Sequence, residues 1–264
     1  MWCRSVIEQL FKISYKGKIF PVHPSKKEIL GLKYFKDLEE VPAKIDASFV
    51  GVNRNTTIEV VKKLNDLNAG GAVCFASGFL EAEDDKQGSG ELQKSLIEAA
   101  GDMPILGPNC YGFINYLDRS VLWPDQHGGN PVDKGVAILT QSSNLAINIT
   151  MQTRGLPISY IMSVGNQASL GFSEIGMYLL SDPRVTALGL HIEGIGDVRA
   201  FEELAAKARK LSKSIVVLKV GKSAEARKAA QSHTASLAGD AQSAKSLFKR
   251  LGIAEVDRLE VLID

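Results

Sequence analysis

The sequence predicts an α/β fold built from two doubly wound domains, each with a parallel sheet that helices cover on both faces. Short apolar, β-branched runs alternate with helix-like segments, and these runs lack the polar alternation of half-exposed strands. The chain has 264 residues, which is enough for two domains of roughly 130 residues each. Helix and strand breakers gather at residues 123–131, so we place the domain boundary there, between residues 1–128 and 129–264.

The first half begins with a predicted helix at about residues 1–14 rather than with a strand. The apolar runs that end in glycine or polar turns predict strands at 18–22, 47–52, 71–75 and 104–106, with helices at 56–68 and 91–100 between them. A doubly wound nucleotide-binding domain ordinarily opens with a strand and a glycine-rich turn before its first helix. We therefore expect these two elements to precede residue 1.

The second half repeats the same alternation of strands and helices. Its apolar runs predict strands at 135–140, 158–164, 185–192 and 214–220. Helices are expected at about 145–154, 170–180, 200–211 and 240–251. Ser142 or Ser143 lies where a residue capping the first of these helices is needed.

Composition and charge exclude several classes of protein. The chain is 45% hydrophobic and 23% charged, and 31 Lys and Arg against 30 Asp and Glu give a net charge of +1, without the basic excess of a nucleic-acid-binding protein. No apolar run approaches the roughly 18 residues that cross a bilayer, and residues 1–18 lack a signal-peptide core. Cys3, Cys74 and Cys110 show no CxxC spacing, so neither a disulfide framework nor a metal site is predicted. We expect a cytoplasmic protein with reduced thiols and no membrane or nucleic-acid partner.

The strongest chemical signal is the segment AQSHTASLAG at residues 230–239. It follows a predicted strand and precedes a helix, which places His233 on the carboxyl side of a parallel sheet, where α/β folds bind their ligands. Small neighbours leave the imidazole accessible. The residues alone leave open a second interpretation, an exposed loop histidine with a local Ser or Thr hydrogen bond.

Several motifs in order along the chain resemble the NDP-forming acyl-CoA synthetases, which are relatives of the succinyl-CoA synthetase α subunit. The motifs that carry this resemblance are SHTASLAGD at 232–240, HIEGIGDVRAF at 191–201, GPNCYGF at 107–113 and TQSSNLA at 140–146, with weaker support from PVHPSKKEILGL at 21–32 and ASGF at 76–79. The resemblance implies a Rossmann-like CoA-binding domain, here lacking its first strand and glycine-rich turn, followed by a flavodoxin-like ligase domain.

The resemblance also implies a reaction and two catalytic residues. The family reversibly converts acid, CoA and ATP into acyl-CoA, ADP and phosphate. His233 matches the histidine that is phosphorylated during turnover, a role that suits a neutral imidazole nitrogen near pH 7. Glu193 matches the carboxylate that bonds the other ring nitrogen and fixes its tautomer. Taken alone, Glu193 is equally consistent with a helix cap or a solvent-facing side chain, and His191 is expected to be a packed strand residue.

The phosphate group is expected at the start of a helix, where backbone N–H groups and the helix dipole favour an anion. The residues that match this strand–turn–helix are Gln141, Ser142, Ser143 and Asn144, and a second loop with Gly165 and Asn166 is expected near the same group. The family commonly has glycine at position 143, so a positive φ there would conflict with serine. A plain helix cap and an ordinary turn are the structural alternatives.

CoA and its acyl group are expected to contact loops of the first domain. The residues that the resemblance assigns to them are His23, Lys26, Asn53, Ser77, Gly78, Asn109 and Cys110. Simple turns are equally good explanations for Asn53, Ser77 and Gly78. We reject Cys110 as a nucleophile, because nothing in the sequence near it predicts an activated thiolate.

The sequence has no room for an ATP-grasp domain, which implies a partner. ATP or ADP with Mg²⁺ would then bind only to an ATP-grasp (β-type) subunit or domain outside this chain, and a homodimer is compatible with the resemblance as well. Two other classes of function stay open: a CoA- or acyl-CoA-binding regulatory module without complete catalysis, and an NAD(P)-dependent oxidoreductase fragment. The last is disfavoured because the chain contains no GxGxxG motif.

Overall fold

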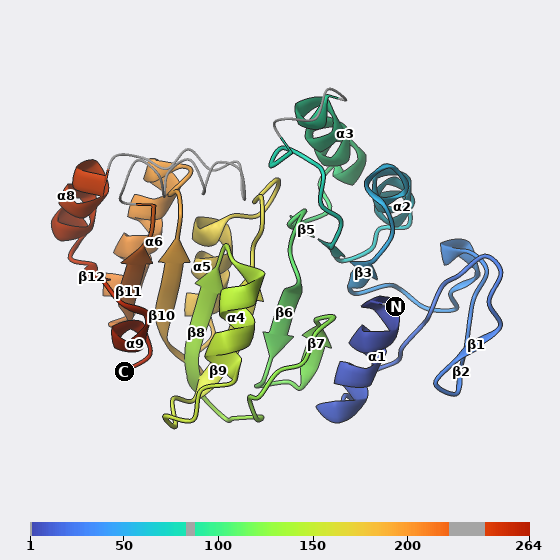
Figure 1. Ribbon diagram of the computed structural model, residues 1–264, viewed down its shortest axis with the longest axis horizontal. Helices are drawn as coiled ribbons and strands as arrows, with labels where there is room; N and C mark the ends of the chain where they lie inside the picture. The colour runs from blue at the N-terminus through green and yellow to red at the C-terminus, as the bar shows by residue number, and fades with distance from the viewer. Residues whose placement is uncertain (1, 83–87, 222–240) are drawn as a thin grey trace.

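A computed structural model describes residues 2–82, 88–221 and 241–264 of the chain (Figure 1). The strands form a seven-stranded sheet, a three-stranded sheet and a two-stranded hairpin. In the described part of the chain, no helix combines the length and apolar character needed to cross a bilayer.

The elements of the first half as far as residue 106 include three α-helices, one 3₁₀ helix and five short strands. Their bounds are α1 (Trp2–Lys12), β1 (Glu28–Ile29), β2 (Leu32–Lys33), the 3₁₀ helix η1 (Leu38–Glu40), β3 (Ser48–Val50), α2 (Arg54–Asp66), β4 (Ala72–Cys74), α3 (Ser89–Ala100) and β5 (Ile105–Leu106). The remaining elements are β6 (Gly112–Asn115), β7 (Ser120–Leu122), β8 (Gly135–Thr140), α4 (Ser143–Thr150), β9 (Ile158–Ser163), α5 (Phe172–Ser181), β10 (Val185–Ile192), α6 (Val198–Lys210), β11 (Ser214–Lys219), α8 (Ala241–Leu251), β12 (Ala254–Val256) and α9 (Leu259–Leu262).

The large sheet has the strand order β12-β11-β10-β8-β9-β6-β7. Strands β8 to β12 are mutually parallel, and β6 and β7 extend the sheet in antiparallel fashion. If the parallel strands are numbered in chain order, their spatial order is 2-1-3-4-5, which is the flavodoxin-like arrangement. The strand order reverses between β8 and β10, so a ligand crevice is expected at the carboxyl ends of these two strands.

The smaller sheet pairs β3, β4 and β5 in parallel. Every residue of β4 and β5 is buried, as expected for a parallel sheet covered on both faces. Helices α2 and α3 pack beside this sheet, and their apolar residues share one cluster with it, including Val61, Leu64 and Leu96, which have no exposed surface.

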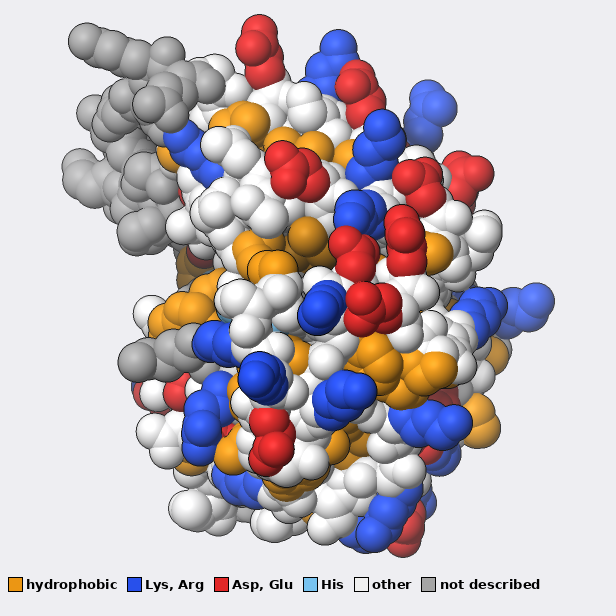
Figure 2. Space-filling model, turned by 90° about the vertical axis from the view of Figure 1, so that its right-hand side faces the viewer, with side chains coloured by type: hydrophobic (Ala, Val, Ile, Leu, Met, Phe, Trp, Pro, Cys, Tyr) orange, Lys and Arg blue, Asp and Glu red, His pale blue; other side chains and the backbone are white. Residues whose placement is uncertain are grey.

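The two halves of the chain share a core. Helix α1 places Val6 and Leu10 in the same cluster as Ile114 of β6, Trp123 and Ile138 of β8. The first helix therefore packs on the large sheet rather than on the small one alone. On the face shown in Figure 2, Lys and Arg side chains are interspersed with Asp and Glu.

The α/β class, the parallel sheets and the succession of two layered domains agree with the prediction from sequence. The strand expected at 18–22 is wrong: Val22 forms only an isolated bridge with Phe35, because no strand among the described residues pairs with the rest of this run and Pro21 has no N–H to donate. Sheet membership would divide the chain before Gly112, whereas the boundary at 128/129 falls after β7, and that boundary stays a prediction.

Candidate functional site

A cleft of about 870 Å³ lies where the carboxyl edges of the two sheets meet. Its wall from the second half contains Gln141, Ser142, Ser143, Asn144 and Glu193. These residues directly follow β8 and β10, the two strands at the reversal of strand order. The cleft thus occupies the position at which doubly wound folds bind ligands, and its volume is within the usual range of ligand pockets.

The start of helix α4 forms part of this wall, which we call the polar wall. Ser142 is the N-cap residue, and its hydroxyl accepts a hydrogen bond from the Leu145 N–H at 3.3 Å. Thr140 Oγ1 accepts from the Ser142 N–H at 3.0 Å, which fixes the turn between β8 and the helix. The helix N-terminus faces the cleft through residues that line it, so its dipole favours an anion there.

Gln141 connects the two strand ends. Its side chain is 3% exposed, and its Oε1 accepts from the Glu193 N–H at 2.6 Å and from the Gly194 N–H at 3.2 Å. The Gln141 Nε2 atom has no hydrogen-bond partner within the described structure, although it is fully buried. A buried amide donor in a cleft wall requires an acceptor, and a phosphate oxygen is one.

Ser143 holds the two halves together. Its Oγ accepts from the Tyr111 N–H at 3.2 Å and lies 2.7 Å from Ser163 Oγ. Ser143 is the first residue of α4 and is absent from the residues with positive φ. The geometry at this position therefore accommodates a side chain, and serine is compatible with it.

The facing wall comes from the first half of the chain. Asn53 caps α2 by accepting from the Thr56 N–H at 3.1 Å, and Arg54 follows it at the first position of the helix. Both residues line the cleft together with Ser77. Arg54 Nη1 donates to the Gly78 carbonyl at 2.8 Å, so the neighbouring Gly78 acts through its backbone and does not itself line the cleft. A guanidinium group at this wall is suited to a phosphate or pyrophosphate.

An aromatic surface completes the first-half wall. Trp2, Phe75 and Tyr111 all line the cleft, with ring centroids 5.1 Å apart for Trp2 and Phe75 and 5.6 Å apart for Phe75 and Tyr111. The cleft therefore has an apolar, aromatic part in addition to its anion-binding groups. A ligand with a charged end and an apolar body matches this division.

Cys110 and Asn109 lie between the two walls and line the cleft. Burial raises the pKa of the Cys110 thiol well above its usual value, and the nearby Cys74 raises it further, so the thiol stays protonated at neutral pH. Asn109 adopts φ +58, and its N–H donates to the Ala76 carbonyl at 2.9 Å.

Gly165 and Asn166 do not line the cleft but support it from behind. The Asn166 N–H donates to the Pro108 carbonyl at 3.0 Å, and its side-chain amide donates to Glu81 and Gln93 of the first half. Gly165 packs so closely on the 107–109 loop that a Cβ would lie 2.2 Å from Pro108 O. These contacts join the loop at 165–168 to the cleft-forming loop at 107–109.

His23 and Lys26 are absent from the cleft lining. His23 Nδ1 accepts from the N–H groups of Ser25 and Lys26, both at 3.2 Å, and its ring lies edge-on to Tyr34. In this structure the histidine orders its own loop. The contacts of His23 and Lys26 with CoA stay a prediction.

Beneath the polar wall lies a buried layer that sequence reasoning did not identify as functional. His191 is 7% exposed, and its Nδ1 lies 3.1 Å from Thr140 Oγ1. Burial lowers the pKa of His191 to about 4, and the Lys219 charge adds to this effect, so the ring is neutral at pH 7. Lys219 itself is only 2% exposed and donates to the Glu193 carbonyl at 2.7 Å.

His233 lies outside the described residues, so its contact with Glu193 stays a prediction. The structure does bring together Glu193, the four residues 141–144 and four of the residues expected to bind CoA. The side chains that sequence reasoning missed include Trp2, Arg54 and Phe75 of the cleft lining and the buried Lys219. Arg54 had a usable signal, because it directly follows a predicted strand and a capping asparagine on the carboxyl edge. Within residues 2–82, 88–221 and 241–264, no group of three or more His, Cys, Asp or Glu side chains could hold a metal ion.

Comparison with known families agrees with this architecture. The CoA binding domain family matches residues 1–116, and the succinyl-CoA ligase-like flavodoxin domain family matches residues 133–264. Both domains that the sequence predicts are therefore present, in the expected order.

Similar proteins include ligases that act on several acids. A trans-feruloyl-CoA synthase from an unidentified prokaryote is 32% identical over 98% of this chain and 37% of its own length. The α subunit of the ADP-forming acetate–CoA ligase II of Pyrococcus furiosus is 32% identical over 94% of this chain and 53% of its own length.

Among solved structures, the dinucleotide-forming acetyl-coenzyme A synthetase 1 of Ca. Korarchaeum cryptofilum, in complex with phosphate and ADP, superimposes with a TM-score of 0.86. It is 30% identical, and the match covers 98% of this chain and 55% of that one. The chain thus spans about half or less of the length of these relatives. It belongs to the NDP-forming acyl-CoA synthetase family of ADP-forming acid–CoA ligases, in which it corresponds to the CoA-binding, α-like portion.

Proposed function

We propose that this chain is the CoA-binding and phosphohistidine-carrying part of a reversible, ADP-forming acyl-CoA synthetase. His233 takes a phosphoryl group from an acyl phosphate formed in the cleft and gives it to ADP on an ATP-grasp subunit or domain. The observation that carries the proposal is the meeting of Gln141–Asn144 and Glu193 at one cleft, at the strand ends where this fold binds ligands.

The chemistry of the polar wall supports a phosphate site. The α4 N-terminus offers its dipole, and the unpaired Gln141 Nε2 offers a donor. When the acyl phosphate transfers its phosphoryl group to a ring nitrogen of His233, the P–O bond breaks and the carboxylate leaves. Glu193, 8% exposed at the same wall, would stabilise the positive charge that develops on the ring.

The facing wall supports a thioester substrate. Arg54 is placed to pair with a phosphate or pyrophosphate, and the aromatic surface is placed to cover an apolar body. CoA combines both features. Asn53, Ser77, Asn109 and Cys110 would contact its pantetheine arm or acyl group, with the buried Cys110 thiol as a neutral contact only.

The proposal is tested by incubating the chain and its ATP-grasp partner with γ-labelled ATP and Mg²⁺. We expect acid-labile label on the chain that His233→Asn abolishes and that Glu193→Gln reduces. Label that is unchanged in His233→Asn would reject the proposal. Glu203→Gln, an exchange on helix α6 outside the cleft lining, is the matched control and should keep the label.

A CoA-binding regulatory module is the second candidate, because the four expected CoA-binding residues that line the cleft would serve it as well. Calorimetry with acetyl-CoA separates the two. Acetyl-CoA binding without any phosphoenzyme, in the presence of a competent partner, would support the module and contradict the ligase.

A further inference from the structure

Lys219 is the most deeply buried charged side chain among those for which the structure gives an exposed fraction. It is the last residue of β11 and is 2% exposed. Lysine is almost never fully buried unless its ammonium group is satisfied, so a buried lysine at a ligand-binding edge requires an explanation.

The contacts of Lys219 provide that explanation. Its Nζ donates to the carbonyl oxygens of Glu193 at 2.7 Å and of Val220 at 2.6 Å. One ammonium group thus connects the residue after β10 with the residue after β11. In the sheet, Lys219 is paired with Ile192, directly before Glu193.

The opposite side of the Glu193–Gly194 peptide is held by Gln141, whose Oε1 accepts the N–H of Gly194 at 3.2 Å and also that of Glu193 at 2.6 Å. Both backbone polar groups of Glu193 are therefore held by buried side chains from the two flanking strands, β8 and β11. Two such bonds restrict the rotation of this peptide and hence the direction of the Glu193 side chain.

The positive charge of Lys219 also acts on the buried residues beneath the polar wall. It contributes to the low pKa of His191, which lies beneath the polar wall. A fixed positive charge below the phosphate end of the cleft favours an anion in that end.

We propose that Lys219 is a positioning residue, which fixes the peptide that carries Glu193 and adds positive charge to the anion-binding end of the cleft. The inference rests on the proposed function only for its effect on phosphoryl transfer. The restraint on the Glu193 peptide follows from the contacts themselves.

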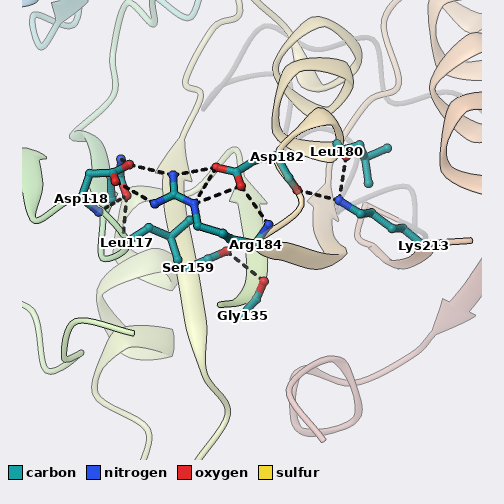
Figure 3. A network of polar contacts seen from close by, with 9 residues as sticks. Leu117, Asp118, Gly135, Ser159, Leu180, Asp182, Arg184 and Lys213 are labelled. Atoms are coloured by element: carbon teal, nitrogen blue, oxygen red, sulfur yellow. Dashed lines mark hydrogen bonds and ion pairs between the residues drawn. The ribbon is translucent and has the colours of Figure 1, made fainter. Parts of the chain in front are cut away.

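The chain offers a matched control at the other end of the same strand. Lys213, directly before β11, likewise donates to two carbonyl oxygens, those of Leu180 at 2.7 Å and Asp182 at 2.6 Å (Figure 3). Its surroundings are far from the cleft, beside the Arg184 network with Asp118 and Asp182. Lys213→Met therefore removes a lysine that bonds carbonyl oxygens in the same way, without touching the site.

The experiment compares Lys219→Met with Lys213→Met in the protein together with its ATP-grasp partner. We expect Lys219→Met to slow the incorporation of acid-labile label from ATP by about 10²-fold, because a misplaced carboxylate costs this much, while the Kd for CoA changes by no more than about twofold. Lys213→Met should keep the wild-type rate. A wild-type labelling rate in folded Lys219→Met would overturn the inference.

A second readout does not depend on activity. Hydrogen exchange of the amides of Glu193 and Gly194 should become faster in Lys219→Met and stay unchanged in Lys213→Met. If wild-type protein takes no label, the proposed function fails, and amide exchange still decides the positioning role. If Lys219→Met does not fold, Lys219→Gln, which keeps an amide donor group without the charge, replaces it in both measurements, and wild-type values there would contradict the inference.

Discussion

Replacing Gln141 by methionine is the most informative perturbation of the polar wall. The exchange keeps the approximate shape of the side chain and removes the acceptor for the N–H groups of Glu193 and Gly194. A buried N–H without a partner costs about 1–3 kcal/mol, so two of them cost about 3 kcal/mol together, because the longer bond of 3.2 Å is the weaker one.

The assay is denaturation of Gln141→Met by urea and by heat. For a chain of this size, a loss of about 3 kcal/mol lowers Tm by roughly 6–12 °C. Gln126→Met, an exchange at an exposed position outside the cleft lining, is the control, and we expect it to keep wild-type stability. A Gln141→Met variant as stable as wild type would show that the strand ends are not joined by this side chain.

Two further predictions concern stability and the cleft wall. Burial lowers the pKa of both His127 and His191 to about 4, so the folded state resists protonation, and stability is complete above about pH 6.5 and lost as the pH falls toward 4. At pH 5 the loss of unfolding free energy is about 2 kcal/mol for each histidine. His127→Gln should therefore remove about half of the change in unfolding free energy that urea titrations measure between pH 7 and pH 5. An unchanged pH dependence in this variant would contradict the burial argument. Gly165→Ala forces a Cβ to within 2.2 Å of Pro108 O, so we expect a loss of about 1–3 kcal/mol and weaker CoA binding by calorimetry. Gly155→Ala, at φ +80 with no atom within 4 Å, has the backbone strain without the clash, and equal effects of the two exchanges would refute this reasoning.

The parallel strands were predictable because their apolar runs are continuous. β8 and β10 have the predicted bounds, and β9 and β11 agree within one residue, since the interior of a doubly wound sheet excludes polar side chains. The antiparallel pair β6 and β7 was missed because these strands are short and have one partly exposed face, a pattern that also fits a loop. The run at 18–22 was assigned to a strand from composition alone, yet pairing requires a neighbour and only Phe35 is available.

The candidate site was predictable in part for the same reason. Glu193 and Gln141 were identified from the family resemblance of their motifs, and both follow predicted strands, whose carboxyl ends gather at one edge of a parallel sheet. Lys219 was not identified, because a lysine at the end of a strand is ordinarily exposed, and its burial depends on carbonyl groups of a neighbouring strand. Asn166 was assigned to phosphate, but its side chain contacts Glu81 and Gln93, which only the folded chain brings near.

The most direct test of the account is to locate the phosphoryl group by tandem mass spectrometry, under conditions that preserve acid-labile bonds, after the chain and its ATP-grasp partner have turned over. The account predicts the group on a peptide containing His233, with its amount reduced in Glu193→Gln. A phosphoryl group on any other residue, or none on the chain during active turnover, would contradict it.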